Sequence, residues 1–364
     1  MARVKADIDT DVLTEAKKRI HHIFDLFDRV VVMFSGGKDS LVVLHLVREV
    51  LIERATPPGK VGVANDLIPK VDVVFRDEEL IPDEVINFVD GYRRQPWVRM
   101  LWFTVPLASS KYVMGVSHSY IQWDPARGPD RWVRPKPAWG INLEPGDTRV
   151  MDQYTMDAFT ASHYGTGKIA FLTGIRAAES LIRFRASVNK LNENYINAVT
   201  DPAARNVNLC KPIFDWEEDD VFRYFYDRGI KYCSLYDLQM WSGGSMRVST
   251  PLHAEAAKQF DRIKATAPDF YQRVTNAFPE MLAHERYFKE LDRDALMARY
   301  GQSYAGVRTW IEENIQDEKQ LALALKRYDS AMGRATMETY PPDYLLGAFM
   351  SGAYKREILP KAKT

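Results

Sequence analysis

The stretch Val30-Val31-Val32-Met33-Phe34-Ser35-Gly36-Gly37-Lys38-Asp39-Ser40 places five apolar residues directly before a glycine-containing polar turn. A short, fully apolar run that ends at a turn is typical of a strand buried on both faces of a sheet. Helical periodicity follows from about Ser40 to Arg54. The sequence therefore predicts a buried strand, a tight turn and a helix, the opening unit of an α/β fold.

The turn itself has the residue types that bind an anion such as a phosphate. Its paired glycines let the backbone turn tightly and approach an anion without a Cβ in the way. The amides at the N-terminus of the following helix carry partial positive charge. Ser35 and Ser40 add hydroxyl donors, and Lys38 adds a positive charge. Asp39 is expected either to bind magnesium or to cap the helix amides. The spacing differs from that of a Walker A loop.

The strand–helix pattern repeats along the chain. Further apolar runs predict strands at Val71–Phe75, Arg99–Val105, Lys168–Thr173 and Cys210–Phe214, and helical spacing predicts helices at Asp11–Arg29 (capped by Asp9 or Thr10), Pro82–Tyr92 and Glu217–Arg228. Strands that alternate with helices form crossover units. We therefore expect a mostly parallel five-stranded sheet with helices on both faces.

A helical C-terminal region is expected to follow the α/β domain, which we place at residues 1–250. Residues 108–147 are rich in proline and glycine and are interpreted as an insertion loop. After about Leu252 no strand pattern is present, so residues 251–364 are expected to be helical. The predicted helices are His253–Ala265, Asp269–Phe288 with a break at Pro279, Asp292–Tyr300, Gly306–Ile315 and Glu318–Tyr328.

Composition excludes several classes of protein. The 49 Lys and Arg residues balance 49 Asp and Glu residues, which excludes a globally basic nucleic-acid coat. Two cysteines exclude a disulfide framework and an iron–sulfur cluster, so no Fe-S cofactor is expected. The seven histidines lack metal-ligand spacing. No bilayer-spanning apolar run or signal peptide is recognised, which predicts a cytoplasmic protein without a membrane partner.

Three motifs resemble one known family. The segment 35–40 resembles the PP-loop of the ATP pyrophosphatase (adenine nucleotide alpha-hydrolase) superfamily. Gly174-Ile175-Arg176-Ala177-Ala178-Glu179-Ser180 is similar to the Gly-x-Arg-x-x-Glu-Ser signature of its phosphoadenosine phosphosulfate (PAPS) reductase branch. Lys211-Pro212-Ile213-Phe214-Asp215-Trp216, continuing to Leu235-Tyr236-Asp237, resembles a third stretch of that branch. The resemblance covers roughly residues 10–250.

The resemblance implies a Rossmann-like sheet that binds ATP or PAPS, with Mg²⁺, across the carboxyl ends of its strands. It implies that the Ser35–Ser40 loop holds the phosphates and that Phe34 and Asp77 flank the adenosine. Arg176 and Arg183 would reach the phosphates, Glu179 would orient an arginine, and Gly174 begins their motif. Independently, Arg176, Glu179 and Arg183 are at helical spacing, which also suits a surface ion pair.

The implied reaction is cleavage of ATP at its α-phosphate, in which an adenylyl group goes to an unknown acceptor and pyrophosphate is released. In this interpretation Lys38 and Arg176 stabilise the developing charge, and Asp39 and Asp77 bind the metal. The reductases of the family use a C-terminal cysteine, but no cysteine follows Cys233 here. Sulfonucleotide reduction would therefore depend on Cys233. Another hypothesis is a non-catalytic, nucleotide-dependent regulator that acts with a ParB-like partner or DNA.

The resemblance is greatest to stand-alone proteins, often encoded by phages and prophages, that are grouped with a transcriptional co-activator alongside a ParB-like partner. Residues 111–139 interleave aromatic and cationic side chains, which suits contact with nucleic acid or a partner, a lid over the nucleotide, or a purely structural loop. The aromatic residues of the C-terminal helices are expected to form a core and could form a homodimer face.

Overall fold

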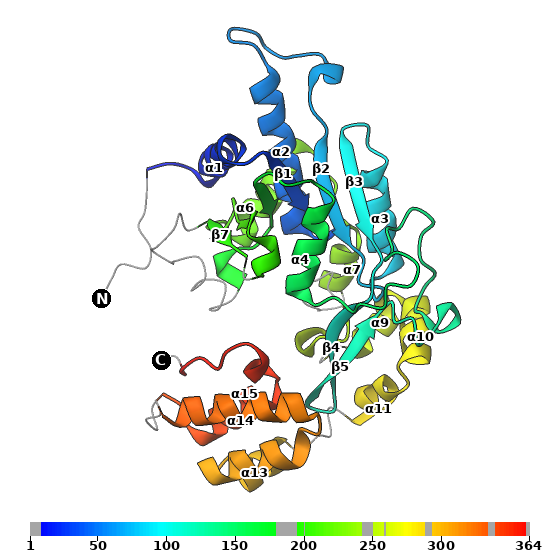
Figure 1. Ribbon diagram of the computed structural model, residues 1–364, viewed down its shortest axis with the longest axis vertical. Coiled ribbons are helices and arrows are strands. Elements are labelled where there is room, and N and C mark those ends of the chain that lie inside the picture. Colours follow the sequence, from blue (N-terminus) through cyan, green and yellow to red (C-terminus); the bar gives the residue numbers. More distant parts are fainter. Residues whose placement is uncertain are drawn as a thin grey trace. The chain divides into compact units, whose positions relative to one another are not determined.

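The computed structural model describes residues 9–179, 195–199, 201–241, 250–257, 260–287, 293–333 and 339–361 (Figure 1). The chain divides into two compact units. Unit 1 comprises residues 1–108 and 121–248, and unit 2 comprises residues 109–120 and 249–364. Each unit is described separately below.

Unit 1 is built on a sheet whose described part has six strands in the order β3-β2-β1-β6-β8-β7. The strands are β1 (Arg29–Met33), β2 (Val71–Arg76), β3 (Val98–Phe103), β6 (Ile169–Leu172), β7 (Ile196–Ala198) and β8 (Val207–Cys210). All neighbouring pairs are parallel except β7–β8, which is antiparallel. The expected mostly parallel α/β sheet is confirmed, with one strand more than the five predicted.

Helices cover both faces of this sheet (Figure 1). Val30 and Val32 of β1 face one core, which includes residues of α1 (Val12–Leu26), α2 (Lys38–Ala55), α3 (Asp83–Arg93) and α6 (Glu218–Arg228). Val31 faces a second core that includes residues of α4 (Gln153–Ser162). Successive side chains of a strand point to opposite faces, so an all-apolar strand is what two cores require.

Two local predictions need correction. The cap of α1 is Asp11, whose carboxylate accepts a hydrogen bond from the Thr14 amide at 2.9 Å, rather than Asp9 or Thr10. The fifth predicted strand, Cys210–Phe214, is placed too late, because β8 ends at Cys210 and a turn follows. Pro212 has no amide hydrogen to donate to a neighbouring strand, which favours the end of β8 before it.

Unit 2 contains a β-hairpin and a group of helices. The hairpin strands are β4 (Leu107–Val113) and β5 (Val116–Gln122), whose outer ends belong to unit 1. Apart from Leu107, the hairpin lies within residues 108–147, so the prediction of a loop is wrong for this part of the segment. The helices are α8 (Ala254–Ala257), α9 (Phe260–Thr266), α10 (Pro268–Ala277), α11 (Glu280–Tyr287), α12 (Arg293–Tyr300), α13 (Tyr304–Asn314), α14 (Glu318–Met332) and α15 (Pro342–Met350).

The helical character expected after residue 250 is confirmed, including the break before Pro279. The sequence patterns missed α15. In unit 2, Trp310 and Ile311 of α13 pack with Leu345, Leu346 and Phe349 of α15 in one buried cluster. None of the helices in the described ranges is both long enough and apolar enough to cross a bilayer.

His45 of α2 is an enclosed titratable group in unit 1. Its Nε2 is 2.8 Å from the Tyr92 hydroxyl, and its ring packs against Trp97 with the ring centres 5.7 Å apart. Burial lowers the pKa of His45 to about 4, although the Glu49 carboxylate opposes this shift. His45 is therefore neutral at pH 7 in the folded protein.

This pKa generates a testable dependence of stability on pH. The unfolded His45 takes up a proton near pH 6.5, whereas the folded one does so only near pH 4, so falling pH favours unfolding within this window. Between pH 7 and pH 5 we expect His45 to remove about 2 kcal/mol from the free energy of unfolding. Urea titrations at both pH values should give a smaller loss for His45→Gln than for the unsubstituted protein. Equal losses would contradict the assignment.

Candidate phosphate-binding site

The predicted phosphate turn joins β1 to α2 at the carboxyl edge of the sheet. Gly36 has φ +77°, and a Cβ there would lie 2.8 Å from methyl groups of Val85 and Val89 in α3. Glycine is therefore needed both for the backbone conformation and for the packing. Gly37 is the N-cap of α2, and as a glycine it has no side chain to cap the helix amides. Ser35 is exposed, so the turn reaches solvent.

Hydrogen bonds within the turn hold its shape. The Ser40 hydroxyl donates to the Gly37 carbonyl at 2.9 Å and lies 3.1 Å from the Ser35 hydroxyl. The Ser35 amide donates to Ser40 Oγ at 3.2 Å. Phe34, directly before the turn, is buried, and its amide donates to the Val74 carbonyl of the adjacent strand. The two hydroxyls that the sequence predicted as phosphate donors are thus beside the start of α2.

The loop after β6 packs directly onto this turn. A Cβ on Gly174 would lie 2.5 Å from both the carbonyl carbon of Asp39 and the amide nitrogen of Ser40. Glycine at position 174 therefore permits a backbone-to-backbone approach that no other residue allows without displacement. This approach brings Arg176, two residues later, to the first turn of α2.

Two buried cations meet the Asp39 carboxylate. Arg176 Nε donates to Asp39 Oδ1 at 2.6 Å, and Lys38 Nζ lies 3.2 Å from Asp39 Oδ2. Arg176 is 4% exposed and Lys38 is 5% exposed. Glu179 accepts a hydrogen bond from the Arg176 amide at 3.4 Å, and its carboxylate is 3.9 Å from Arg176 Nε. The predicted pairing of Arg176 with Glu179 is therefore present, together with a stronger contact to Asp39.

The expected helical face of Arg176, Glu179 and Arg183 is only partly described. Arg176 precedes a single 3-10 turn, Ala177–Glu179, rather than lying inside a long helix. Ser180 and Arg183 lie outside the described residues. The carboxylate contact between Arg176 and Asp39 depends on the loop approach at Gly174, not on helical spacing.

Two further side chains reach Lys38 from α6 and from α7 (Leu235–Trp241). Glu218 Oε1 lies 3.2 Å from Lys38 Nζ, and the Tyr236 hydroxyl accepts a hydrogen bond from the Lys38 amide at 3.0 Å. Burial raises the pKa of Tyr236, so its phenol stays protonated at neutral pH. Sequence reasoning missed Glu218, since nothing local relates it to a turn 180 residues earlier. Tyr236 was within a quoted motif but had no assigned role.

The loop between β8 and α6 is anchored to α1. Arg19 makes two hydrogen bonds of 2.7 Å to the Asp215 carboxylate and one of 2.9 Å to the Pro212 carbonyl. The Trp216 indole donates to the Val12 carbonyl at 3.1 Å, and its own carbonyl lies 3.5 Å from Arg176. The third family-like motif therefore has a structural role: its hydrogen bonds hold the loop beside Arg176 in place.

Asp77 is at the carboxyl end of β2 but belongs to a separate buried cluster. Its carboxylate accepts hydrogen bonds from the Trp102 indole at 2.8 Å, from the Glu79 amide at 3.0 Å and from the Arg134 guanidinium. Burial raises the pKa of Asp77, and Arg134 opposes the shift. The Asp77 side chain has no exposed surface.

Glu79 anchors the insertion beside Asp77. Its carboxylate accepts two hydrogen bonds from the Arg127 guanidinium and one each from the Trp123 and Val133 amides, at 2.5 to 3.0 Å. Glu79 has φ 59°, an uncommon conformation that these contacts hold. Of the three interpretations of the segment 111–139, these contacts support the structural one for Trp123, Arg127 and Arg134.

The structure does not fit the predicted magnesium pair. Both oxygens of Asp77 already accept hydrogen bonds in a solvent-inaccessible cluster, and both oxygens of Asp39 contact buried cations. Within the described ranges, no three His, Cys, Asp or Glu side chains are grouped so as to hold a metal ion. We therefore derive no step through a protein-bound metal.

Comparison with known proteins identifies one family and one curated relative. Residues 29–263 match the phosphoadenosine phosphosulfate reductase domain family. The chain is 25% identical over 261 residues to the uncharacterized protein YbdN of Escherichia coli (strain K12), an alignment that covers 68% of this chain and 59% of YbdN. The chain thus spans less than two thirds of that relative.

The comparison with solved structures gives matches of low sequence identity and low TM-score. FMN adenylyltransferase of Candida glabrata, solved with FAD and inorganic pyrophosphate, is 14% identical, with a TM-score of 0.40 and coverage of 64% of this chain and 66% of that chain. Phosphoadenylyl-sulfate reductase of Candida auris, solved with phosphate, is also 14% identical, with a TM-score of 0.35 and coverage of 62% and 84%.

The glycine contact at position 174 generates a prediction. Gly174→Ala should lower the free energy of unfolding by about 1 to 3 kcal/mol, because the new Cβ overlaps the backbone of α2. Gly91→Ala is the matched control, since Gly91 is in α3 and a Cβ there meets nothing within 4 Å. We expect this control to stabilise the protein by up to about 1 kcal/mol. Urea unfolding measures both, and equal midpoints would refute the packing argument.

Proposed function

Because the chain belongs to the phosphoadenosine phosphosulfate reductase domain family, we propose that it is an adenine-nucleotide-utilising enzyme that cleaves ATP at the α-phosphate. The proposed products are pyrophosphate and an adenylylated acceptor. The observation that carries the proposal is the pair of buried cations, Lys38 and Arg176, at the N-terminus of α2.

This arrangement suits the charge of a phosphate chain. The dipole of α2 and the amides of its first turn favour an anion at Gly37, although the Lys38 amide already donates to the Tyr236 hydroxyl. Lys38 and Arg176 are positioned by carboxylates before any ligand arrives, so little reorganisation is needed when charge develops. Asp39 acts in the proposal as the residue that positions both cations.

The proposed reaction is an in-line displacement at the α-phosphorus. A nucleophilic atom of the acceptor forms a bond to the α-phosphorus, and the bond from that phosphorus to the bridging oxygen of the β-phosphate breaks. The bond's electron pair leaves with pyrophosphate, and the acceptor's proton goes to solvent. Lys38 and Arg176 would stabilise the negative charge that increases on the departing oxygens.

Reduction of a sulfonucleotide by Cys233 is less well supported. The Cys233 side chain is 2% exposed, and burial raises the pKa of its thiol. A nucleophilic cysteine needs an accessible thiolate, and both observations oppose this.

The first test measures pyrophosphate release from ATP supplied as its magnesium complex. Lys38→Met and Arg176→Met should each lower the rate at least about ten-fold, because each removes a cation that stabilises the transition state. Lys60→Gln, which changes an exposed lysine of unit 1, is the control and should leave the rate unchanged. Tight ATP binding without pyrophosphate release would instead support the nucleotide-dependent regulator and refute the proposed reaction.

A second test uses Glu218, whose carboxylate would compete with a bound phosphate for Lys38. Glu218→Gln should increase the affinity for ATP about two- to five-fold at low salt, because Glu218 then no longer neutralises Lys38. Asp219→Asn is the matched control, since Asp219 is exposed and adjacent but makes no such ion pair. Calorimetric titration should give a difference between the variants that shrinks in high salt. Equal affinities would show that Lys38 does not contact the ligand.

A further inference from the structure

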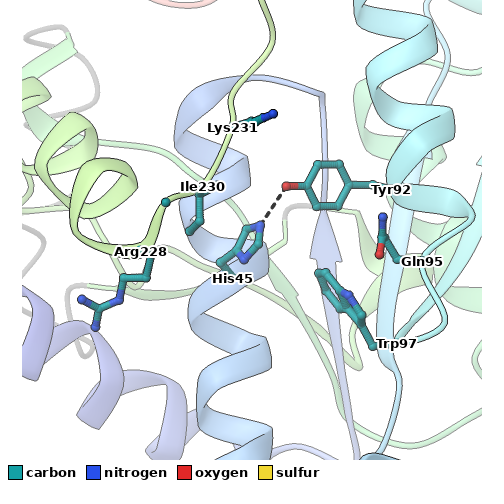
Figure 2. A pocket seen from close by; sticks show the side chains of 8 residues that line it. His45, Tyr92, Gln95, Trp97, Arg228, Ile230 and Lys231 are labelled. Carbon is teal, nitrogen blue, oxygen red and sulfur yellow. Dashed lines mark hydrogen bonds between the residues drawn. The ribbon is translucent and has the colours of Figure 1, made fainter.

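A cavity lies in unit 1, at the opposite edge of the sheet from the phosphate turn. It has a volume of about 390 Å³ and is lined by His45, Tyr92, Gln95, Trp97 and residues 228–231 (Figure 2). Gln95 and Trp97 are in the loop that leads into the amino end of β3, and residues 229–231 follow α6. The phosphate turn, by contrast, follows the carboxyl end of β1. A ligand in this cavity is therefore separate from the proposed nucleotide.

Aromatic rings form the wall of the cavity. His45 and Tyr92 are perpendicular, with ring centres 5.7 Å apart, and Trp97 is 6.2 Å from Tyr92 at 83°. Figure 2 shows the three rings together, with the hydrogen bond between His45 and Tyr92. The His45 and Trp97 rings are tilted at 59°, so the three rings present both edges and faces, which suits a planar ring that stacks on one neighbour and meets another edge-on.

The polar groups that line the cavity favour a negatively charged ligand. Its lining includes Lys231 and Arg228 but no acidic residue. Arg228 is already paired with Glu49, at 3.0 Å. Lys231 is exposed and has no ion pair within the described ranges. The Gln95 side chain makes one long hydrogen bond, of 3.5 Å, to the Gly91 carbonyl, so most of its capacity remains available.

From this lining we propose that the cavity binds a small planar aromatic anion, with its ring against His45 and Trp97 and its anionic group at Lys231. The volume is at the lower end of the range for small-molecule sites, which limits the ligand to one or two rings. The combination of an aromatic wall with a few polar groups is typical of such sites. The proposal does not depend on the reaction at the phosphate turn.

Ligand-observed NMR titration with four probes tests the proposal on the full chain. Benzoate and nicotinate should bind at millimolar concentration. Benzamide, which lacks the charge, and cyclohexanecarboxylate, which lacks the planar ring, should each bind at least about five-fold more weakly than benzoate. Absence of benzoate binding, or binding of benzamide as tight as that of benzoate, would each overturn the proposal.

Matched variants test whether benzoate binds in this cavity. Lys231→Gln should weaken benzoate about five-fold, whereas Lys60→Gln, at an exposed lysine elsewhere in unit 1, should not. Trp97→Leu should weaken benzoate, whereas Trp139→Leu, at a half-exposed tryptophan outside the cavity lining, should not. Lys231 is exposed, so its substitution leaves the fold intact even if that of Trp97 does not. Unchanged affinity in Lys231→Gln would overturn the assignment of the anionic group.

Discussion

The close approach of Gly174 to the backbone of Asp39 and Ser40 is the contact on which the candidate site depends. Parallel pairing of β1 with β6 puts the ends of both strands at one edge of the sheet. The loops that leave these ends can then meet only if one of them has no side chain at the contact. Because position 174 is glycine, Arg176 reaches the Asp39 carboxylate at 2.6 Å.

The charges at this contact have two consequences. Desolvation of a cation is costly, and the carboxylates of Asp39, Glu218 and Glu179 offset that cost for Lys38 and Arg176. The same carboxylates also compete with an incoming phosphate. Glu218 is the most exposed of them, with 46% of its side chain accessible, so it is the partner that a ligand can replace with least disturbance of the buried network.

Two other acidic residues at the same sheet edge, Asp77 and Glu79, have a structural role. Asp77 and Glu79 accept hydrogen bonds from the indole of Trp102, the guanidinium groups of Arg127 and Arg134, and backbone amides. They attach part of the proline-rich insertion to the end of β2. Residue type and position at a strand end are therefore insufficient to identify a ligand residue, since a carboxylate there can be fully used in packing.

The sequence by itself determined the elements that depend on neighbouring residues along the chain, namely β1, α2 and the turn between them. The apolar run before Ser35 and the periodicity after it predicted β1 and α2 to within a few residues, because a doubly buried strand and a helix each have a characteristic pattern. The paired glycines between these two patterns predicted the turn. The order of the three family-like motifs indicated the family, which the comparison shows.

Only the tertiary structure decided the features that depend on distant partners. β7 has three residues and is a strand because it pairs with β8, and the β4–β5 hairpin lies in a segment whose breakers predict a loop. The contact of Glu218 with Lys38 joins residues 180 positions apart. Such contacts are set by chain packing rather than by residue spacing, so no periodicity in the sequence could reveal them.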